Sequence, residues 1–383
     1  MADGIITAAG LSSRMHDLKA LLPIENRAAI VRIADQLLRG GVDRLIVVTG
    51  HREDEIRSAL ISYPVVFVRN RNYATNQMLD SIQIALSVRW GQPDMPCLMT
   101  PVDVPLFRDD TVRTLLHRAT EGEYGYVLPK CNNRTGHPIL LSPDAAMEVQ
   151  GYCGEGGLKG CMKQSDLIVD HIPVEDSGML YDMDTPEDYQ RICNVATEIR
   201  TAGRAALDVS GDSINGTGDS KEKANDFPSG ELCARLLDEM PDSVWAHSLA
   251  VQKAAMELAG RARNCGVQLD LRLVGTAALL HDIRRTEQNH ALAGARYLRE
   301  LGYDAVADVV ECHHDLDAEG LNEASIVYLA DKCVSGDQRV SVRERFEKSL
   351  LKCTTPEAIA AHERRCRQAM KIVELFEKVC GPI

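Results

Sequence analysis

The chain has 383 residues, of which 45% are hydrophobic and 26% charged, and its net charge is −13 with a pI of about 5.4. This length suits two ordinary domains, and the composition excludes a wholly disordered chain. A broad nucleic-acid-binding face is also excluded, because an acidic surface repels a phosphate backbone. No segment approaches about 20 consecutive apolar residues, and the first residues lack a basic leader pattern. We therefore expect a cytoplasmic protein without a membrane segment.

Up to about residue 195, short apolar runs alternate with segments of helical period. The runs GIITAAG, RLIVVTG and PVVFVRN are separated by helices expected over residues 28–39 and 53–60. Such alternation indicates a parallel sheet covered by helices on both faces. The runs MPCLMTPVD, YGYVLP, HPILLS and LIVDHIPV extend the sheet. We expect a doubly wound, mostly parallel, Rossmann-like α/β domain over residues 1–195.

The remainder of the chain has a different character. Residues 196–228 are rich in Gly, Ser, Asp and Lys, which predicts a flexible linker. After Ser229 the strong segments, such as VWAHSLAVQKAAMELAGRA and ASIVYLADK, have helical period, and no hairpin signal separates them. We expect an all-α domain over residues 229–383.

A candidate phosphate-binding loop follows the first predicted strand, residues 4–7. The segment AAGLSSRMHDLK contains small residues that leave backbone N–H groups accessible to an anion, and Arg14 and Lys19 add positive charge. The sequence has neither a Walker A motif nor G-x-G-x-x-G. Taken alone, the segment is as compatible with a simple tight turn.

Two aspartates mark further candidate positions. Asp103 follows a predicted strand and so lies at a carboxyl end, where open α/β sheets bind ligands. Asp184 precedes a helix expected to begin at Pro186. Each has a structural alternative: Asp103 can form the turn, and either Asp184 or Thr185 can cap the helix.

Together, the segments AAGLSSRMHDLKALLP, NRNYATNQMLDSIQIAL, TPVDVPLF, NRTGHPILL, GEGGLKGCM and YDMDTPEDY resemble the MobA-like NTP transferases over residues 3–193, and most closely the molybdenum cofactor cytidylyltransferases. The resemblance implies transfer of a nucleotidyl group, with CTP favoured, to a phosphorylated acceptor such as molybdopterin, with pyrophosphate release. It also implies molybdoenzyme maturation partners. Implied nucleotide-binding residues are Ala8, Ala9, Gly10, Ser12, Arg14, Lys19 and Ser81.

The same resemblance assigns the chemistry. Arg14 and Lys19 would act on the phosphates, while Asp103, also catalytic, and Asp184 would hold Mg²⁺, which prefers oxygen ligands. Gly136–Pro138 would lie on the acceptor side. Two positions depart from the family, which usually has glycine where His16 and Asn76 stand. These departures leave the identities of nucleotide and acceptor open.

The helical half places histidines and aspartates within or beside apolar helices, as in AALLHDI and YLADK. Burying such groups is costly unless a partner satisfies them, and a shared metal is a suitable partner. The order H…HD…H…H…D resembles the HD superfamily of metal-dependent phosphohydrolases over residues 243–336. The resemblance implies a first metal site formed by His247, His281, Asp282 and Asp331, with Asp282 also catalytic. It further implies His290 and His313 as the additional ligands of a two-metal site, with His314 as the alternative to His313.

These ligand types suit Mn²⁺, Fe, Co²⁺ or Ni²⁺, and the implied reaction is hydrolysis of a phosphoester or pyrophosphate. We therefore expect a bifunctional enzyme. One alternative gives the first domain a sugar- or alditol-phosphate acceptor, which a narrow pocket near Gly136–Pro138 would favour over a pterin. Another makes one domain a nucleotide sensor that regulates the other.

Overall fold

The computed structural model describes the chain apart from residues 12–14, 16, 90–93, 207–226 and 352, and apart from the side chains of residues 199–206. The described residues of Met1–Ala85, Asp94–Ala145 and Gln164–Ala224 form one compact unit, and those of Leu86–Pro93, Ala146–Lys163 and Asn225–Ile383 form a second. Among the described helices, none combines the length and apolar character required to cross a membrane.

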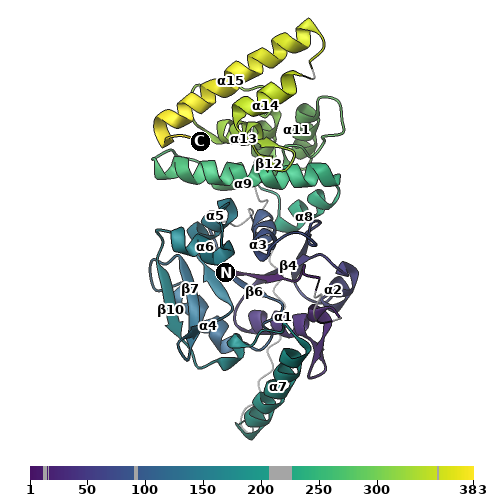
Figure 1. Cartoon of the computed structure of the whole chain (residues 1–383), viewed down its shortest axis with the longest axis vertical. Helices are drawn as coiled ribbons and strands as arrows, with labels where there is room; N and C mark the ends of the chain where they lie inside the picture. Colours follow the sequence, from purple (N-terminus) through teal and green to yellow (C-terminus); the bar gives the residue numbers. More distant parts are fainter. Residues whose placement is uncertain (12–14, 16, 90–93, 207–226, 352) are drawn as a thin grey trace. The chain divides into compact units, whose positions relative to one another are not determined.

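A single sheet with the strand order β10-β7-β9-β6-β1-β4-β5 organises the first unit (Figure 1). The pairs β1–β4, β1–β6, β4–β5 and β7–β10 are parallel, whereas β9 runs antiparallel to β6 and β7. The mostly parallel sheet is thus confirmed, and the run HPILLS supplies an antiparallel strand, β9. The strands are β1 (Asp3–Thr7), β4 (Arg44–Thr49), β5 (Val65–Arg69), β6 (Cys97–Pro101), β7 (Tyr126–Cys131), β9 (Ile139–Leu141) and β10 (Val169–Pro173), with β8 (Arg134–Thr135) beside β7 and a separate hairpin of β2 (Pro23–Ile24) and β3 (Arg27–Ala28).

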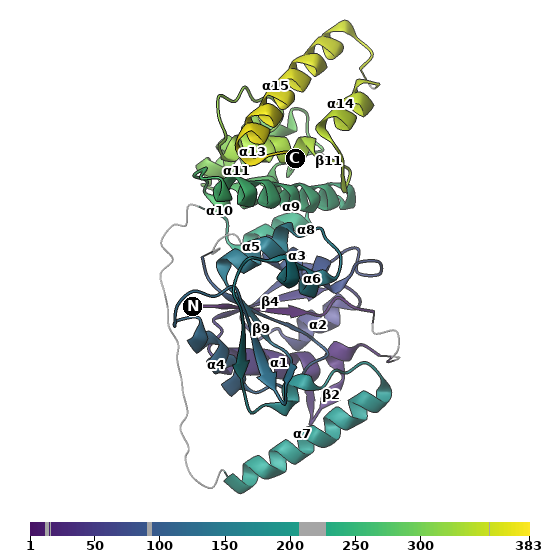
Figure 2. The same cartoon turned by 60° about the vertical axis from the view of Figure 1, so that its left-hand side comes forward.

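Helices lie on both faces of this sheet. On one face, α1 (Ala29–Arg39), α2 (Glu53–Ala59) and α4 (Asp109–Arg118) bury apolar side chains in a common core with the strands. On the other lies α3 (Met78–Ser87) (Figures 1 and 2). The helices predicted over residues 28–39 and 53–60 are confirmed to within one residue at each end. The remaining helical segments before residue 207 are η1 (Lys19–Leu21), α5 (Pro143–Gly151), α6 (Gly157–Gln164), η2 (Ser177–Leu180) and α7 (Pro186–Ala206); most of α5 and nearly all of α6 belong to the second unit.

Helix α7 continues through Ala206, beyond residue 196, where the composition predicts the linker to begin. The sequence TEIRTAGRAA has helix-forming residues that outweigh its glycine. A change in composition therefore does not mark the end of this helix.

The parallel register brings three loops to one edge of the sheet. Thr7 pairs with Val48 of β4 and with Pro101 of β6, so the segments that follow these strands emerge side by side. Gly50 permits the closest approach, because a Cβ atom there would lie 2.6 Å from the carbonyl oxygen of Ala9. Only glycine fits this position without movement of the loop that follows β1.

The second unit is helical, as predicted, with one small addition. Helix α9 lies against α10 and α13, and α11 against α12. A two-stranded hairpin, β11 (Val334–Ser335) with β12 (Gln338–Arg339), follows α13; strands of this length are too short to produce a periodic signal. The helices are α8 (Gly230–Asp238), α9 (Asp242–Asn264), α10 (Leu271–Leu280), α11 (His290–Glu300), α12 (Asp304–Cys312), α13 (Glu323–Lys332), α14 (Val342–Leu350) and α15 (Pro356–Cys380).

Candidate functional sites

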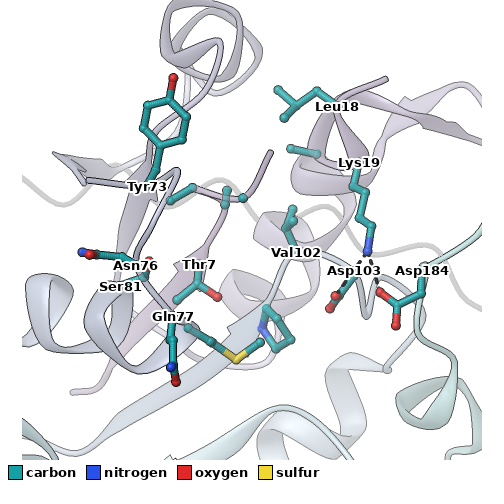
Figure 3. A pocket seen from close by; sticks show the side chains of 16 residues that line it. Thr7, Leu18, Lys19, Tyr73, Asn76, Gln77, Ser81, Val102, Asp103 and Asp184 are labelled. Atoms are coloured by element: carbon teal, nitrogen blue, oxygen red, sulfur yellow. Dashed lines mark hydrogen bonds and ion pairs between the residues drawn. The ribbon is translucent and has the colours of Figure 1, made fainter. Parts of the chain in front are cut away.

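A cavity of about 350 Å³ opens at the carboxyl edge of the parallel strands in the first unit. Lys19, Asp103 and Asp184 lie at one side of it, and Tyr73, Asn76 and Ser81 at the other (Figure 3). The structure thus brings together, in one cavity, seven of the residues that the sequence singles out: Ala8, Ala9, Gly10, Lys19, Ser81, Asp103 and Asp184. Ser12, Arg14 and His16 lie outside the described residues.

The charged side of the cavity is organised around one ammonium group. Lys19 Nζ lies 2.7 Å from Asp184 Oδ1 and 3.7 Å from Asp103 Oδ2. Asp184 is available for this contact because Thr185, the other candidate cap, caps α7, which begins at Pro186. The Thr185 N–H donates to Asp188 Oδ2 (3.1 Å), and the Asp188 N–H donates to Thr185 Oγ1 (3.2 Å). The predicted acidic pair therefore converges on a single positive charge.

This arrangement fits a hard divalent cation. Two carboxylate oxygens from separate elements face one positive centre, and oxygen donors are the ligands that Mg²⁺ prefers. Burial raises the pKa of Asp103 to about 6, against the opposing charge of Lys19. A nearby cation is what keeps such a buried carboxylate ionised.

The first residues of the loop after β1 are anchored to the sheet and line the cavity. Ala8 and Ala9 are buried, and the Ala8 N–H donates to the carbonyl of Val48 at 2.9 Å, which fixes the start of the loop. Gly10 lines the cavity, and a Cβ atom there would have no described atom within 4 Å. The space beside Gly10 is thus open to a ligand.

The opposite side is held by Asn70, which the sequence analysis did not single out. Asn70 is 1% exposed; its Nδ2 donates to Ser81 Oγ at 3.1 Å, and its Oδ1 accepts from the Asn72 N–H at 3.0 Å and from Asn76 Nδ2 at 3.2 Å. Asn76 is therefore anchored where the family usually has glycine. Asn70 directly follows β5, so the rule that ligands gather at strand carboxyl ends could have identified it.

The expected acceptor segment is tightly packed. A Cβ atom on Gly136 would lie 2.4 Å from the carbonyl oxygen of Met179, and burial lowers the pKa of His137 to about 4, so its imidazole is neutral. A separate cavity of about 410 Å³ shares Asp184 with the first. Its lining includes two arginines and three aspartates: Arg134, Arg191, Asp182, Asp184 and Asp188.

In the second unit, the six predicted ligands form one cluster, with Asp282 at its centre. Asp282 Oδ1 lies 3.1 Å from His290 Nε2 and 3.6 Å from His313 Nε2. Asp282 Oδ2 lies 3.5 Å from His281 Nε2 and 3.9 Å from His247 Nε2. Asp331 Oδ1 approaches His247 Nε2 at 3.2 Å and His281 Nε2 at 4.0 Å. One oxygen of Asp282 thus faces each of two histidine groups.

Helix ends determine how these ligands are presented. His281 and His313 are the C-terminal cap residues of α10 and α12, and His290 begins α11, so the pair His281-Asp282 directly follows a helix. Helix ends leave backbone carbonyls without intrahelical partners. His281 Nδ1 donates to the Ala278 carbonyl at 2.8 Å, and His313 Nδ1 to the Val310 carbonyl at 2.6 Å.

The hydrogen bonds from the Nδ1 atoms of His281 and His313 determine which nitrogen of each ring can bind a metal. A carbonyl can only accept, so Nδ1 carries the proton and the neutral ring's Nε2 presents a lone pair. The Nε2 atoms of His281 and His313 are buried without a hydrogen-bond partner among the described residues. Burial lowers the pKa of His281 to about 4, so its ring is not a cation. Buried lone pairs that face carboxylate oxygens require a positive partner, and a divalent transition metal fits them.

His314 lies next to this cluster. Its ring centroid is 4.4 Å from that of His290, and it forms a candidate ligand group with His290 and His313. His313 is 1% exposed, and its Nε2 lies 3.6 Å from Asp282 Oδ1, while burial lowers the pKa of His314 to about 3. The two histidines therefore occupy the same cluster.

Basic residues border the cluster. Lys332 Nζ lies 2.6 Å from Asp331 Oδ2 and donates to the His313 carbonyl at 3.1 Å. Arg285 Nη1 lies 3.5 Å from Asp282 Oδ1, and Arg345 Nη2 lies 4.0 Å from Asp331 Oδ1. The sequence analysis singles out neither Arg285 nor Arg345.

Comparison with known proteins identifies both halves. A model of the MobA-like NTP transferase domain matches residues 4–169, and a model of the HD domain matches residues 244–336. The molybdenum cofactor cytidylyltransferase of Escherichia coli (strain K12) is 30% identical over 203 residues, which cover 51% of this chain and 98% of that protein.

Other similarities are partial. The bifunctional protein GlmU of Burkholderia thailandensis is 31% identical over 144 residues, which cover 37% of this chain and 31% of GlmU. A solved nucleotidyl transferase from Methanothermobacter thermautotroptrophicus covers 52% of this chain at 22% identity with a TM-score of 0.46. With an E. coli relative matched over nearly its whole length, the chain belongs to the MobA-like NTP transferase family through its first half and carries an HD domain in its second.

Proposed function

We propose that the chain is a bifunctional enzyme, with a nucleotidyltransferase in residues 1–195, a linker over residues 196–228 and a metal-dependent phosphohydrolase in residues 229–383. The observation that supports the first activity is the convergence of Lys19, Asp103 and Asp184 at one side of a cavity. Nucleotidyl transfer needs positive charge and carboxylate-held Mg²⁺ at the phosphates, together with a separate place for the base.

In the proposed transfer, an oxygen of the acceptor phosphate forms a bond to the α-phosphorus of the nucleotide. The bond from that phosphorus to the oxygen bridging to the β-phosphate breaks, and pyrophosphate leaves with the electron pair. Lys19, with Arg14, balances charge on the phosphates, backbone N–H groups of Ala9 and Gly10 with Ser12 bind them, and Ala8 lines the pocket beside them. Asp103 and Asp184 would hold Mg²⁺, which neutralises charge on the departing pyrophosphate when bound.

We infer CTP as the nucleotide and a molybdopterin-type phosphate as the acceptor. The support is the E. coli relative, which is named a molybdenum cofactor cytidylyltransferase and is matched over 98% of its length. The cavity beside Asp184 is a candidate acceptor site, because Arg134 and Arg191 can contact a phosphate there.

A second acceptor class has its own support. Gly136 packs closely against the carbonyl oxygen of Met179, so little space is left directly beside this residue. This packing favours a smaller sugar- or alditol-phosphate acceptor, which the same chemistry would serve.

Pyrophosphate release tests the transferase. Purified protein with Mg²⁺ is supplied with each nucleoside triphosphate and with molybdopterin, a sugar phosphate or an alditol phosphate. We expect release with CTP and one acceptor class, a loss of at least a hundredfold in Asp184→Asn, and no change in Asp54→Asn, which removes an exposed charge from α2. No release under any combination contradicts the transferase.

The second activity is supported by the convergence of six imidazole and carboxylate side chains on a cluster with buried, unpaired lone pairs. We propose that these residues hold one or two divalent transition metals, with Asp282 contributing one oxygen to each histidine group. Such metals, when bound, polarise water and the phosphate oxygens. The water oxygen forms a bond to phosphorus, the ester or anhydride bond breaks, and the leaving oxygen receives a proton.

Metal analysis tests this half. Elemental analysis of the purified chain should find a transition metal, and added Mn²⁺ or Co²⁺ should support hydrolysis of a phosphomonoester or of pyrophosphate. Absence of both the metal and the hydrolysis contradicts the proposal.

A further inference from the structure

Arg345 reaches the HD cluster from α14, a helix outside the matched HD region of residues 244–336. Its Nη2 lies 4.0 Å from Asp331 Oδ1, at the outer limit of an ion pair and too far for a hydrogen bond. The helix that carries it is well anchored. Ser341 and Glu344 form a capping box at its start, Phe346 is 7% exposed, and the Phe346 carbonyl lies 3.1 Å from His362 Nε2 of α15.

Asp331 does not need Arg345 as a counter-charge. Lys332 Nζ already lies 2.6 Å from Asp331 Oδ2, and His247 Nε2 lies 3.2 Å from Oδ1. Within the described part of the chain, the Arg345 guanidinium makes no hydrogen bond to another side chain. A neutralised carboxylate is a weak reason to hold a guanidinium at this distance.

The position of the Arg345 side chain suits a ligand that enters from solvent. The side chain is 29% exposed, whereas that of Asp331 is 7% exposed, so the guanidinium lies between the buried ligands and the surface. A guanidinium offers five N–H donors in a planar fork that matches two oxygens of a phosphate. Resting on the phosphohydrolase proposed above, we propose that Arg345 is a phosphate-binding residue of the HD site, and that α14 completes the site beyond the HD domain itself.

The substrate class follows from this geometry. A phosphate that gives two oxygens to the Arg345 fork and one to the ligand cluster presents at least three unesterified oxygens, as a phosphomonoester or a terminal pyrophosphate group does. A diester has two unesterified oxygens in total and would have to divide them between the cluster and the guanidinium. The site therefore favours monoesters and terminal phosphates.

The test measures binding of inorganic phosphate to the full-length chain loaded with Mn²⁺, by titration calorimetry, in a Lys19→Met background that disables the nucleotide cavity. Arg345→Ala should weaken phosphate binding by about tenfold to a hundredfold, the range for a hydrogen bond to a charged group, with the Mn²⁺ content unchanged. Arg345→Lys should fall between, because it keeps the charge and loses the fork. Arg343→Ala, which removes an exposed arginine from the same helix, should bind phosphate like the parent.

Two results would overturn the inference. Unchanged phosphate affinity in Arg345→Ala would show that the guanidinium does not contact phosphate. Loss of Mn²⁺ together with phosphate, in both Arg345→Ala and Arg345→Lys, would show that Arg345 supports the ligand cluster instead. If the Mn²⁺-loaded parent neither binds phosphate nor hydrolyses a phosphomonoester, the proposed phosphohydrolase itself is contradicted. Phosphate binding by the parent therefore distinguishes a failure of the Arg345 inference from a failure of the proposed function.

Discussion

Replacing Asp282 by Asn is the sharpest perturbation of the HD cluster, because it keeps the shape of the side chain and removes one negative charge. The two oxygens of Asp282 lie 3.1 to 3.9 Å from four imidazole nitrogens. Any cation held by these histidines therefore lies close to this carboxylate. The substitution should weaken metal binding at both histidine groups.

The magnitude follows from Coulomb's law. One carboxylate charge contributes about 4 kcal/mol for each unit of positive charge about 4 Å away, at an effective dielectric constant of about 20. At about 1.4 kcal/mol per factor of ten, and with two charges on the cation, Asp282→Asn should weaken binding by at least about a thousandfold. Metal at a hundred times the wild-type Kd stabilises the folded state by about 2.7 kcal/mol, which at roughly 2–4 °C per kcal/mol raises Tm by about 5–10 °C.

Thermal unfolding with and without Mn²⁺, followed by differential scanning calorimetry, measures this effect. The wild-type chain should show the upward shift and Asp282→Asn essentially none. Asp308→Asn, which removes a highly exposed carboxylate of α12 that pairs with Arg299, should behave like the wild type. An equal Mn²⁺-induced shift in wild type and Asp282→Asn would refute the metal cluster.

Further predictions concern packing and reactivity. Lys332→Met leaves the buried Asp331 carboxylate without its 2.6 Å partner, so urea unfolding of the metal-free chain should show a loss of about 3–5 kcal/mol; a loss below about 1 kcal/mol would contradict the buried pair. Gly50→Ala places a methyl group 2.6 Å from the Ala9 carbonyl oxygen, so the affinity for CTP should fall in equilibrium binding, and unchanged affinity would show that the loop adjusts freely. Burial raises the pKa of the Cys233 thiol to about 12, so at pH 8 it stays protonated, and peptide mapping should find it unmodified by iodoacetamide until the chain is unfolded in urea; rapid native labelling would contradict its burial.

The sheet and the position of Asp103 could be predicted from sequence because both depend on a regular rule. Parallel strands end at a common edge, so a polar residue after a strand lies near the others there. The role of Asp184 could not be predicted in the same way. Aspartate and threonine both cap helices, and only the fold shows that Thr185 forms the cap with Asp188 while Asp184 faces Lys19.

The ligands of the HD cluster could be named from residue types in order, but their presentation could not. Sequence places His281 within an apolar helical run, whereas α10 ends there and frees the Ala278 carbonyl to fix its tautomer. Helix ends depend on tertiary packing, and their exact residues are weakly encoded locally. Arg345 was missed for a different reason: its relation to Asp331 depends on how α14 packs beside α13, which no local spacing records.

The most direct test of the proposed function follows the α-phosphate of the nucleotide. The chain carrying Asp282→Asn, which disables the proposed phosphohydrolase so that pyrophosphate is not hydrolysed, is incubated with Mg²⁺, an acceptor phosphate and CTP that carries ³²P in the α-position or, separately, in the γ-position. Nucleotidyl transfer predicts that the α-label appears in the acceptor product and the γ-label in pyrophosphate, and that Lys19→Met abolishes both. Labelled CMP without labelled acceptor product, or γ-label released as inorganic phosphate, would contradict the account.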